Sequence, residues 1–473
     1  MKILLTGATG YIGKRLLPVL LKEGYEVICC VRDKKRFDVT KYPYSNLYLI
    51  EVNFLNKESL AVIPNDLDAA YYLIHSMSAT IHDFDTLEKI SALNFKERIS
   101  ETKVRQVIYL SGIVNEEKLS KHLSSRKQVE DILSSGSYSL TTLRAGIIVG
   151  SGSASFEIIR DLVEKLPFMI APRWLNTRSQ PIAIRNVIQY LNGILLNENT
   201  YDKNYDIGGP EILTYKEMLL KFARVRKLNR DIFILPIMTP KLSSYWLYFV
   251  TSTSYKLAVN LVNSMKVEVI CRDNDLNDML KLRLISYEEA VELAFDKIGH
   301  QDVLSSWTDA LSSPTLEKGI SDLISVPTYG CYTNRKKILV DDESRVLDRI
   351  WSIGGDNGWY YVDWLWRFRG FLDKLFGGVG LRRGRKSPTH IEAGDALDFW
   401  RVLYADKENK RLLLYGEMVL PGEAWLEYQI KDGSLYQTAT FRPLGLWGRI
   451  YMYALIPLHY VIFKGLIRKL AAQ

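Results

Sequence analysis

Apolar and polar positions alternate in blocks along the first 150 residues. The apolar run at 3–5 predicts a buried strand, and a helical pattern of leucines follows it at Leu16, Leu17, Leu20 and Leu21. A second apolar run at 25–31 comes after Gly24, a residue that suits the end of a helix. Further runs predict strands at 47–53, 69–74, 107–112 and 139–144. Strands that alternate with helices predict an α/β fold with a doubly wound parallel sheet of the Rossmann type.

The pattern changes after residue 300. Serine, proline and glycine loosen it between 301 and 325 and predict a linker. Beyond it, apolar stretches predict an antiparallel sheet with strands at 411–420, 425–430 and 437–443, and a long helical segment closes the chain. A chain of 473 residues is longer than one core supports. We therefore predict four parts, which are 1–150 (the Rossmann core), 151–300 (a smaller substrate-side subdomain), 301–325 (the linker) and 326–473 (an α+β domain).

The turn after the first strand carries the most informative chemistry. Its glycines have the spacing Gly-x-x-Gly-x-x-Gly, and a strand, a glycine-rich turn and a helix together present backbone N–H groups to a pyrophosphate. The whole unit up to residue 31 has the length of a dinucleotide-binding fingerprint. The alternative is an ordinary α/β turn without a ligand. The predicted cofactor-binding residues of this loop are Thr6, Gly7, Ala8, Thr9, Gly10, Tyr11, Ile12 and Gly13.

The end of the second predicted strand bears on which nicotinamide cofactor binds. Arg32 comes first after Val31, Asp33 comes second, and further cations follow. An acidic residue at this place binds the ribose 2′-hydroxyl of NAD, whereas an arginine pairs with the 2′-phosphate of NADP. We therefore expect NADP(H) in preference to NAD(H). The alternative is a solvated basic loop.

The stretch Thr6–Gly13 resembles the extended and atypical short-chain dehydrogenase/reductase superfamily, and within it the NmrA-like NAD(P)-binding proteins. The resemblance runs to about residue 300, and 205–215 matches the stretch with which extended members build their substrate side. It implies that Asn53 stands where members often contact the adenine with an aspartate. It also implies that Ser111 stands at the place of the catalytic serine or threonine. His75 follows the fourth predicted strand, where ligands of parallel sheets bind.

The resemblance weakens at the next motif. Active members carry Tyr-x-x-x-Lys on the following helix, but this chain has His122 and Arg126 in that register. An imidazole can transfer protons near neutral pH, and an arginine can bind ribose hydroxyls as a permanent cation. Ser111, His122 and Arg126 are therefore the predicted catalytic residues, with Ser111 and Arg126 also touching the cofactor. The alternative is a relic pair on a helix surface.

The C-terminal region resembles a domain of unknown function that is found fused to NmrA-like reductases. Its order, an antiparallel sheet and then a long last helix, also resembles the helix-grip fold of START-type lipid and polyketide carriers. That resemblance implies an apolar cavity between sheet and helix, and core packing of the aromatic side chains is the alternative. The aromatic residues in question are Trp359, Trp364, Trp366, Trp400 and Trp425.

Two functions follow from these resemblances. The first is an NADP(H)-dependent oxidoreductase that acts on an apolar carbonyl or quinone-like compound. The second is a catalytically silent NAD(P)H sensor or scaffold, like some NmrA-like proteins and the dinucleotide-binding accessory subunit of respiratory complex I. A further group, Arg173, Trp174, Arg178 and Gln180, either faces a ligand or forms an ordinary loop.

The charge and composition of the chain limit the kinds of partner that we expect. The net charge of +8 comes without a basic stripe interleaved with aromatics, so we expect no nucleic acid. The four cysteines lack metal-ligand spacing, which favours no metal and a reducing cytoplasm. The apolar segment 450–463 is bracketed by cations and interrupted by Pro457, so we expect a buried or interfacial helix rather than a span. Lys464, Arg468 and Lys469 then make peripheral contact with anionic lipid an alternative to a purely cytoplasmic location.

Overall fold

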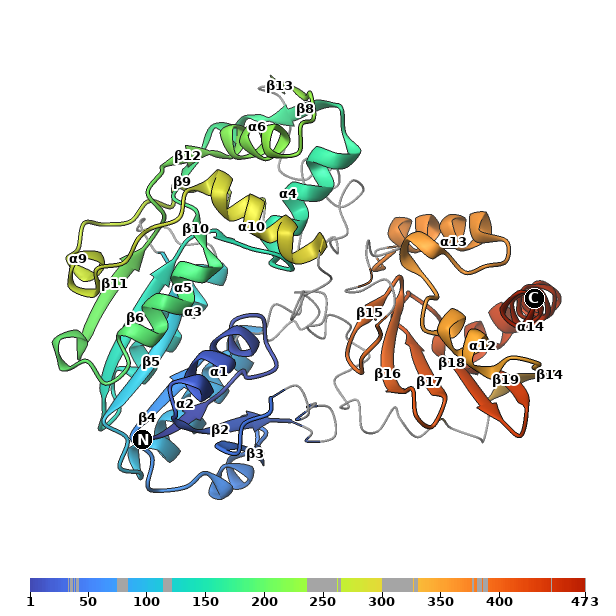
Figure 1. Cartoon of the computed structure of the whole chain (residues 1–473), viewed down its shortest axis with the longest axis horizontal. Coiled ribbons are helices and arrows are strands. Elements are labelled where there is room, and N and C mark those ends of the chain that lie inside the picture. The colour runs from blue at the N-terminus through green and yellow to red at the C-terminus, as the bar shows by residue number, and fades with distance from the viewer. Residues whose placement is uncertain are drawn as a thin grey trace. The chain divides into compact units, whose positions relative to one another are not determined.

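The structure of the chain is a computed structural model. It describes residues 1–32, 34, 37, 39, 42–74, 84–113, 121–235, 262, 265–299, 326, 331–376, 378–380, 385, 390–443 and 445–472. Within these residues the chain forms two compact units, one inside 1–307 and one inside 308–473 (Figure 1). The predicted linker at 301–325 lies outside the described residues.

The first unit is built on a parallel sheet of seven strands. They are β1 (Lys2–Leu5), β2 (Glu26–Val31), β3 (Leu47–Glu51), β4 (Ala69–Tyr72), β5 (Gln106–Gly112), β6 (Ser139–Ala145) and β11 (Lys203–Ile207). Their order across the sheet is β11-β6-β5-β4-β1-β2-β3, and all neighbours are parallel. The six predicted strands are all present, within two residues at each end. The prediction omits β11, whose half-polar sequence does not form an apolar run.

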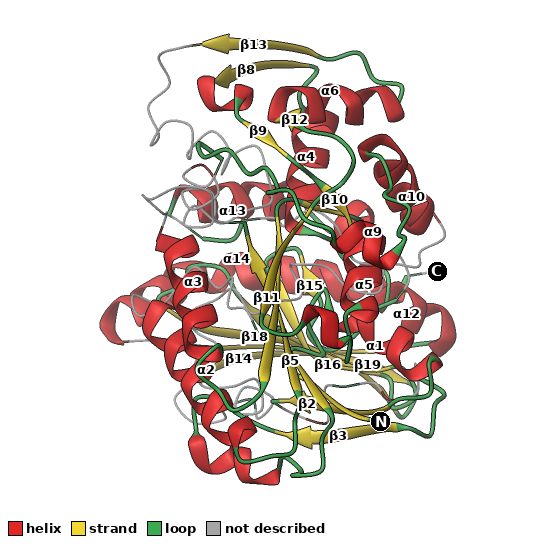
Figure 2. Cartoon of the chain, turned by 90° about the vertical axis from the view of Figure 1, so that its left-hand side faces the viewer, coloured by secondary structure: helices red, strands yellow, loops and turns green. Residues whose placement is uncertain are grey.

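Helices cover both faces of this sheet, as the prediction of a doubly wound fold requires. Figure 2 shows α1 (Gly13–Lys22) and α5 (Ile184–Gly193) on one side and α2 (Phe84–Ser100) and α3 (Lys121–Leu133) on the other. Each side has its own buried cluster of apolar side chains. The neighbours Cys29 and Cys30 belong to opposite clusters because successive side chains of a strand alternate.

A small subdomain follows the sheet. Its helices are α4 (Ala154–Lys165), α6 (Tyr215–Val225), α9 (Leu276–Leu280) and α10 (Tyr287–Gly299). Its short strands are β7 (Ile148–Val149), β8 (Phe168–Pro172), β9 (Arg178–Ser179), β10 (Ile182–Ala183), β12 (Leu213–Thr214) and β13 (Asp231–Leu235). Phe156, Phe222 and Phe295, one each from α4, α6 and α10, hold the helices together with ring centres 5.5–5.6 Å apart.

The second unit is an antiparallel sheet with helices against one face. Its strands are β14 (Tyr332–Leu339), β15 (Ala396–Leu397), β16 (Trp400–Asp406), β17 (Arg411–Gly416), β18 (Gly422–Lys431) and β19 (Ser434–Pro443), in the order β14-β19-β18-β17-β16-β15. Its helices are α12 (Glu343–Ile350), α13 (Asp363–Leu375) and α14 (Gly445–Ala471). The core lies between the sheet and the helices, where Leu414 and Leu426 pack with Ile350 and Leu466.

Two sequence expectations for this unit concern its tryptophans and Pro457. Trp359 and Trp400 are buried in the core with ring centres 6.1 Å apart, so these two aromatics pack against each other. Trp364 is two-thirds exposed. Pro457 does not interrupt the last helix, because α14 continues through it. The proline lies at an exposed position, where water can solvate the carbonyl that loses its amide partner.

Burial gives Asp398 of this unit an altered acidity. Its carboxylate accepts from Trp359 Nε1 over 2.7 Å, and burial raises the pKa of Asp398 to about 6. Because this pKa is higher in the folded chain than in the unfolded one, the stabilisation is present at low pH. It is lost as the pH rises through about 6, and the loss amounts to roughly 3 kcal/mol.

We therefore expect Asp398→Asn to abolish this pH dependence. In urea denaturation of the full chain between pH 4 and pH 7, the wild type should lose stability relative to the variant by roughly 3 kcal/mol. The matched control is Asp348→Asn, at an exposed carboxylate that pairs with Lys407. Parallel stability curves for wild type and Asp398→Asn would contradict the expectation.

Candidate functional site

The turn after β1 has no room for side chains at two of its glycines. Gly7 has a φ of +66°, and a Cβ on it would lie 2.5 Å from the carbonyl oxygen of Leu73. A Cβ on Gly13 would lie 2.3 Å from the carbonyl oxygen of Gly7. The Gly10 amide donates to that same oxygen over 2.9 Å. A side chain at Gly7 or Gly13 would force the turn open, so these positions require glycine.

The turn leads directly into the amino end of α1. The preceding residue, Ile12, provides no side-chain cap, and the first turn of α1 contains no acidic residue. The helix therefore offers its amide end and the positive end of its dipole to an anion. Arg15 lies 3.9 Å from the centre of the Tyr11 ring and donates to the backbone oxygens of Tyr11 and Ser151. These contacts engage the Tyr11 side chain within the protein, so we expect main-chain groups to bind the anion.

The glycine turn also lies where the strand order of the sheet reverses. The chain builds β2 and β3 on one side of β1 and then crosses to β4, β5 and β6 on the other. Open α/β sheets bind ligands outside the carboxyl ends of the strands at this point. The Thr6 hydroxyl joins the two strand ends, because it donates to Tyr71 O and accepts from the Leu73 amide over 2.9 and 3.1 Å.

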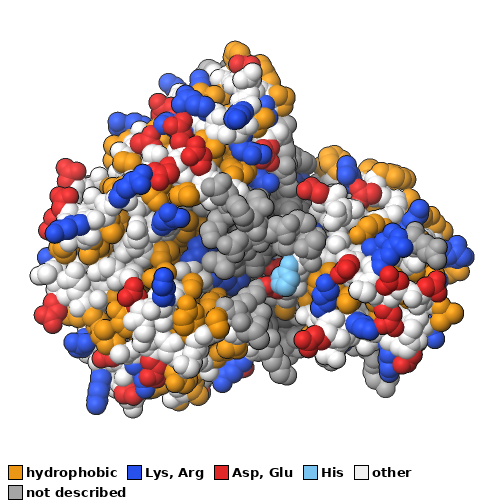
Figure 3. All heavy atoms as spheres, viewed as in Figure 1, with side chains coloured by type: hydrophobic (Ala, Val, Ile, Leu, Met, Phe, Trp, Pro, Cys, Tyr) orange, Lys and Arg blue, Asp and Glu red, His pale blue; other side chains and the backbone are white. Residues whose placement is uncertain are grey.

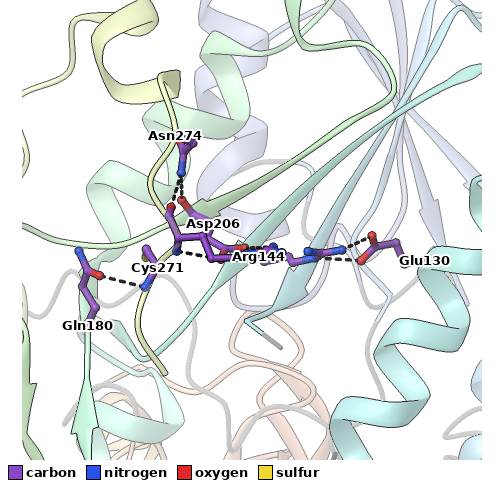
Figure 4. Close-up of polar contacts among 7 residues, drawn as sticks. Glu130, Arg144, Gln180, Asp206, Cys271 and Asn274 are labelled. Carbon is purple, nitrogen blue, oxygen red and sulfur yellow. Dashed lines mark hydrogen bonds and ion pairs between the residues drawn. The ribbon is translucent and has the colours of Figure 1, made fainter. Parts of the chain in front are cut away.

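A row of polar residues crosses the carboxyl ends of three neighbouring strands. Ser111 of β5 is in register with Arg144 of β6, which is in register with Asp206 of β11. Figure 4 shows Arg144 between Asp206 and Glu130 of α3. Arg144 forms a two-pronged ion pair with Glu130, and Asp206 forms one with Arg272 at 2.8 and 2.9 Å. Cations and anions thus alternate along this edge of the sheet.

Polar contacts fix α3 against the sheet and against α2. The Glu130–Arg144 pair holds one part of the helix, and one turn earlier the buried Ser125 hydroxyl donates to Glu88 of α2 over 2.6 Å. Arg126 lies between these two anchors. Arg144 and Glu88 were not predicted, because their partners come from other elements and only the register of the sheet brings them together.

Two buried polar atoms near this edge are unsatisfied. Ser111 Oγ and Arg126 Nε have no well-formed hydrogen bond among the described residues. Both residues lie by Tyr109, whose hydroxyl donates to the Arg126 carbonyl over 3.4 Å. Burial raises the pKa of Tyr109 to about 12, so its hydroxyl stays protonated at neutral pH. Buried polar groups are normally paired, and an unsatisfied pair is suited to receive polar atoms of a ligand.

The remaining predicted site residues are Arg32, Asn53, His122 and His75. Arg32 is exposed at the end of β2. Asn53 follows β3, and its side-chain oxygen accepts from the Leu55 amide over 3.2 Å, which stabilises the turn. His122 lies in the first turn of α3, but its side chain is outside the described part of the chain. His75 lies outside the described residues as well.

The alternative of a ligand-facing group around Arg178 and Gln180 is not supported. The Arg178 guanidinium pairs with Glu268 at 2.8 and 3.0 Å. The Gln180 side chain donates to Gly209 O and accepts from the Cys271 amide, as Figure 4 shows in part. Both side chains hold the segment at 268–271 in place. These contacts are long-range in sequence, so local composition does not reveal them.

In the described part of the chain, no group of three or more His, Cys, Asp or Glu side chains is placed to hold a metal ion. All four cysteines are free thiols. Burial raises the pKa of both Cys29 and Cys30 well above that of an exposed thiol, so neither is reactive.

Two parts of the chain match the models of known protein families. Residues 3–113 match the model of the NAD dependent epimerase/dehydratase family, and residues 331–466 match a family described as a protein of unknown function, DUF2867. Residues 3–113 are thus similar to this family, and the parallel sheet of the first unit has the strand order of a Rossmann fold. This supports the extended short-chain dehydrogenase/reductase part of the prediction. None of the curated proteins matches the chain.

Several solved structures are similar to the first unit, and one of them, with a TM-score above 0.5, has the same fold. A nucleoside-diphosphate-sugar epimerase from Staphylococcus aureus is 14% identical, with a TM-score of 0.51, and the match covers 62% of this chain and 100% of that one. UDP-glucose 4-epimerase from Thermotoga maritima is 14% identical, covers 63% and 99%, and has a TM-score of 0.49. UDP-glucuronic acid 4-epimerase from Bacillus cereus, solved with NAD, is 16% identical, covers 64% and 97%, and has a TM-score of 0.49.

Proposed function

We propose that the first unit binds a nicotinamide dinucleotide, NADP(H) in preference to NAD(H), and reduces an apolar carbonyl or quinone-like compound. The observation that carries this proposal is the turn at Gly7–Gly13. It has no space for a Cβ at Gly7 and Gly13, it leads into an uncapped helix, and it lies at the reversal of strand order. These three features fit a pyrophosphate.

When bound, the cofactor supplies the hydride that the substrate carbon receives. The chain supplies the other contacts. Arg126 Nε, which has no hydrogen bond among the described residues, is suited to a ribose hydroxyl, and the Ser111 hydroxyl is suited to the substrate oxygen. His122, four residues before Arg126 on α3, gives a proton to that oxygen. We also propose that the second unit is START-like and holds an apolar ligand. This part of the proposal rests on the order of its elements, an antiparallel sheet followed by a long last helix.

Turnover of NADPH tests the proposal. The full chain is mixed with NADPH and a panel of apolar ketones, enones, quinones and nucleoside-diphosphate sugars, and the loss of NADPH absorbance is followed. We expect turnover on an apolar member and a fall of about 10²–10⁴-fold in His122→Ala. Ser111→Ala should also lower kcat/KM. The control is Ser134→Ala, an exposed serine at the end of the same helix, which should leave the rate unchanged.

One observation favours a second function, that of a silent NAD(P)H sensor or accessory scaffold. The helix after β5 contains no tyrosine and no lysine in the expected register, because His122 and Arg126 stand there. In that case the chain would bind NADPH tightly and turn over no member of the panel. If a nucleotide sugar were the only compound turned over, the substrate would be a nucleotide sugar and not an apolar carbonyl or quinone-like compound.

Cofactor preference depends on Arg32. We expect Arg32→Ala to weaken NADP binding by about 10–100-fold, because a charge-assisted contact with the 2′-phosphate is lost, and to leave NAD binding unchanged. The control is Lys34→Ala, an exposed cation two residues later. Isothermal titration with both dinucleotides measures the effect. Equal losses in the two variants would indicate a general basic loop instead of a phosphate contact.

A further inference from the structure

The second unit carries an apolar helix face that its own core does not use. Helix α13 has a stripe of side chains spaced three and four residues apart, and each is more than half exposed. They are Trp364, Phe368, Phe371 and Leu375, and Phe376 directly after the helix extends the stripe. Figure 3 shows hydrophobic side chains over α13 along the edge of this unit. A continuous row of exposed aromatics marks an interaction site in a folded protein.

Helix α14 adds a second exposed face. Its segment Trp447–Ala471 is long and apolar enough to cross a membrane. Its second half is part of the core, however, since Phe463, Leu466, Ile467 and Leu470 are buried there. The first half, 445–461, is largely exposed and measures about 25 Å, which is shorter than the roughly 30 Å of a bilayer core. This helix is therefore anchored by its second half and cannot cross a membrane in this fold.

The exposed half of α14 is also apolar and aromatic. Trp447, Ile450, Leu458 and Val461 occupy one side of the helix, opposite the buried side, and all are exposed. The segment at 419–421 joins the two helices, because Arg369 of α13 donates to Val419 O over 3.1 Å and Gly448 of α14 packs against Pro421 O.

The charges on the two helices indicate what kind of partner covers this face. Helix α14 contains four cations, Arg449, Lys464, Arg468 and Lys469, and no carboxylate. On α13 the carboxylate of Asp373 is buried, and that of Asp363 pairs with Arg367 over 2.9 Å. Aromatic residues with basic neighbours are typical of a helix that lies in a membrane interface, where anionic headgroups meet the cations.

We propose that the face formed by α13 and the first half of α14 docks on an anionic lipid bilayer and lies in the plane of its interface. The aromatic rings of α13 enter the headgroup region, and the exposed cations of α14, which are Arg449, Arg468 and Lys469, contact the phosphates. The association is peripheral and reversible. It does not depend on dinucleotide binding by the first unit.

Vesicle flotation of the full chain tests this proposal. We expect the protein to float with phosphatidylcholine vesicles that contain phosphatidylglycerol, and to float poorly with pure phosphatidylcholine or at high salt. Trp364→Ser/Phe368→Ser/Phe371→Ser should lower the partition coefficient at least about tenfold, because three exposed rings lose their burial in the interface. These side chains are exposed, so the variant should keep its circular dichroism and melting temperature.

The chain offers a matched control in its first unit. Phe168 and Phe233, of β8 and β13, are each about half exposed and lie against each other with tilted rings, whose centres are 4.9 Å apart. Phe168→Ser/Phe233→Ser should float like the wild type. Absence of flotation, or equal loss in both variants, would overturn the proposal. Light scattering that reveals a dimer, dissolved by the α13 variant and indifferent to vesicles, would overturn it in favour of a second copy.

Discussion

Replacing Gly7 with alanine should remove most of the dinucleotide affinity of the first unit. The new Cβ would lie 2.5 Å from Leu73 O, on a residue whose φ of +66° disfavours side chains. The turn must then move away from β4, and the amides that meet the pyrophosphate lose their alignment. We expect binding of NADPH to weaken by more than about 100-fold, a loss that corresponds to two or more charge-assisted hydrogen bonds. Titration calorimetry of the full chain measures it.

Gly24 provides the control for this substitution. It lies beyond the other end of α1, with a similar φ of +84°, but a Cβ there would meet nothing within 4 Å. Gly24→Ala therefore has the same conformational cost, about 1 kcal/mol of stability, without crowding the turn. We expect Gly24→Ala to bind NADPH normally. If both variants lost affinity equally, general destabilisation would explain the effect and the turn would not be the binding site.

Replacing Arg401 with methionine should destabilise the second unit by about 3–5 kcal/mol. Arg401 and Glu417 form an ion pair of 3.0 Å, and neither side chain has any solvent exposure. Arg401 also donates to Gly394 O over 2.8 Å. The variant removes the Arg401 charge from beside the buried Glu417 carboxylate. Urea denaturation followed by tryptophan fluorescence reports on this unit, because seven of the ten tryptophans come after residue 350.

A double variant separates the loss of the pair from the loss of packing. Arg401→Met combined with Glu417→Leu removes both charges, and we expect it to recover a large part of the lost stability. Lys407→Met breaks the exposed Lys407–Asp348 pair and should change the free energy of unfolding by less than about 1 kcal/mol. A double variant no more stable than Arg401→Met would show that the cost comes from packing.

The sequence was sufficient for the features that depend on local pattern. The six predicted strands of the first sheet and the glycine turn follow from apolar runs and from glycines at fixed spacing, and both are present in the structure. The strand β14 was missed because three consecutive cations at 335–337 interrupt any apolar pattern, although its exposure alternates as in an edge strand with one face in water. The edge strand β11 was missed for the similar reason that only its second half is buried.

The polar arrangement at the candidate site could not be predicted from local pattern. Ser111, Arg144 and Asp206 are separated by 33 and 62 residues, and only the register of three parallel strands puts them in one row. Arg178 was a candidate for ligand contact because an arginine in a loop has no visible partner in the sequence. Its partner Glu268 lies 90 residues away. Ser111 was predicted only because the resemblance to short-chain dehydrogenases/reductases implies a catalytic serine or threonine at its position. The pattern of apolar and polar residues does not distinguish it.

The way the second sheet closes sets an order for folding on the ribosome. Among the described residues, its first strand, β14, pairs only with its last, β19, and the inner face is covered by the end of α14. None of that core can assemble until nearly the whole of this unit has emerged from the exit tunnel. The parallel sheet of the first unit is complete at Ile207, so it can form while synthesis continues. During synthesis, the apolar strands of the second unit therefore stay exposed longer than those of the first unit. We expect chaperones to bind mainly to these strands.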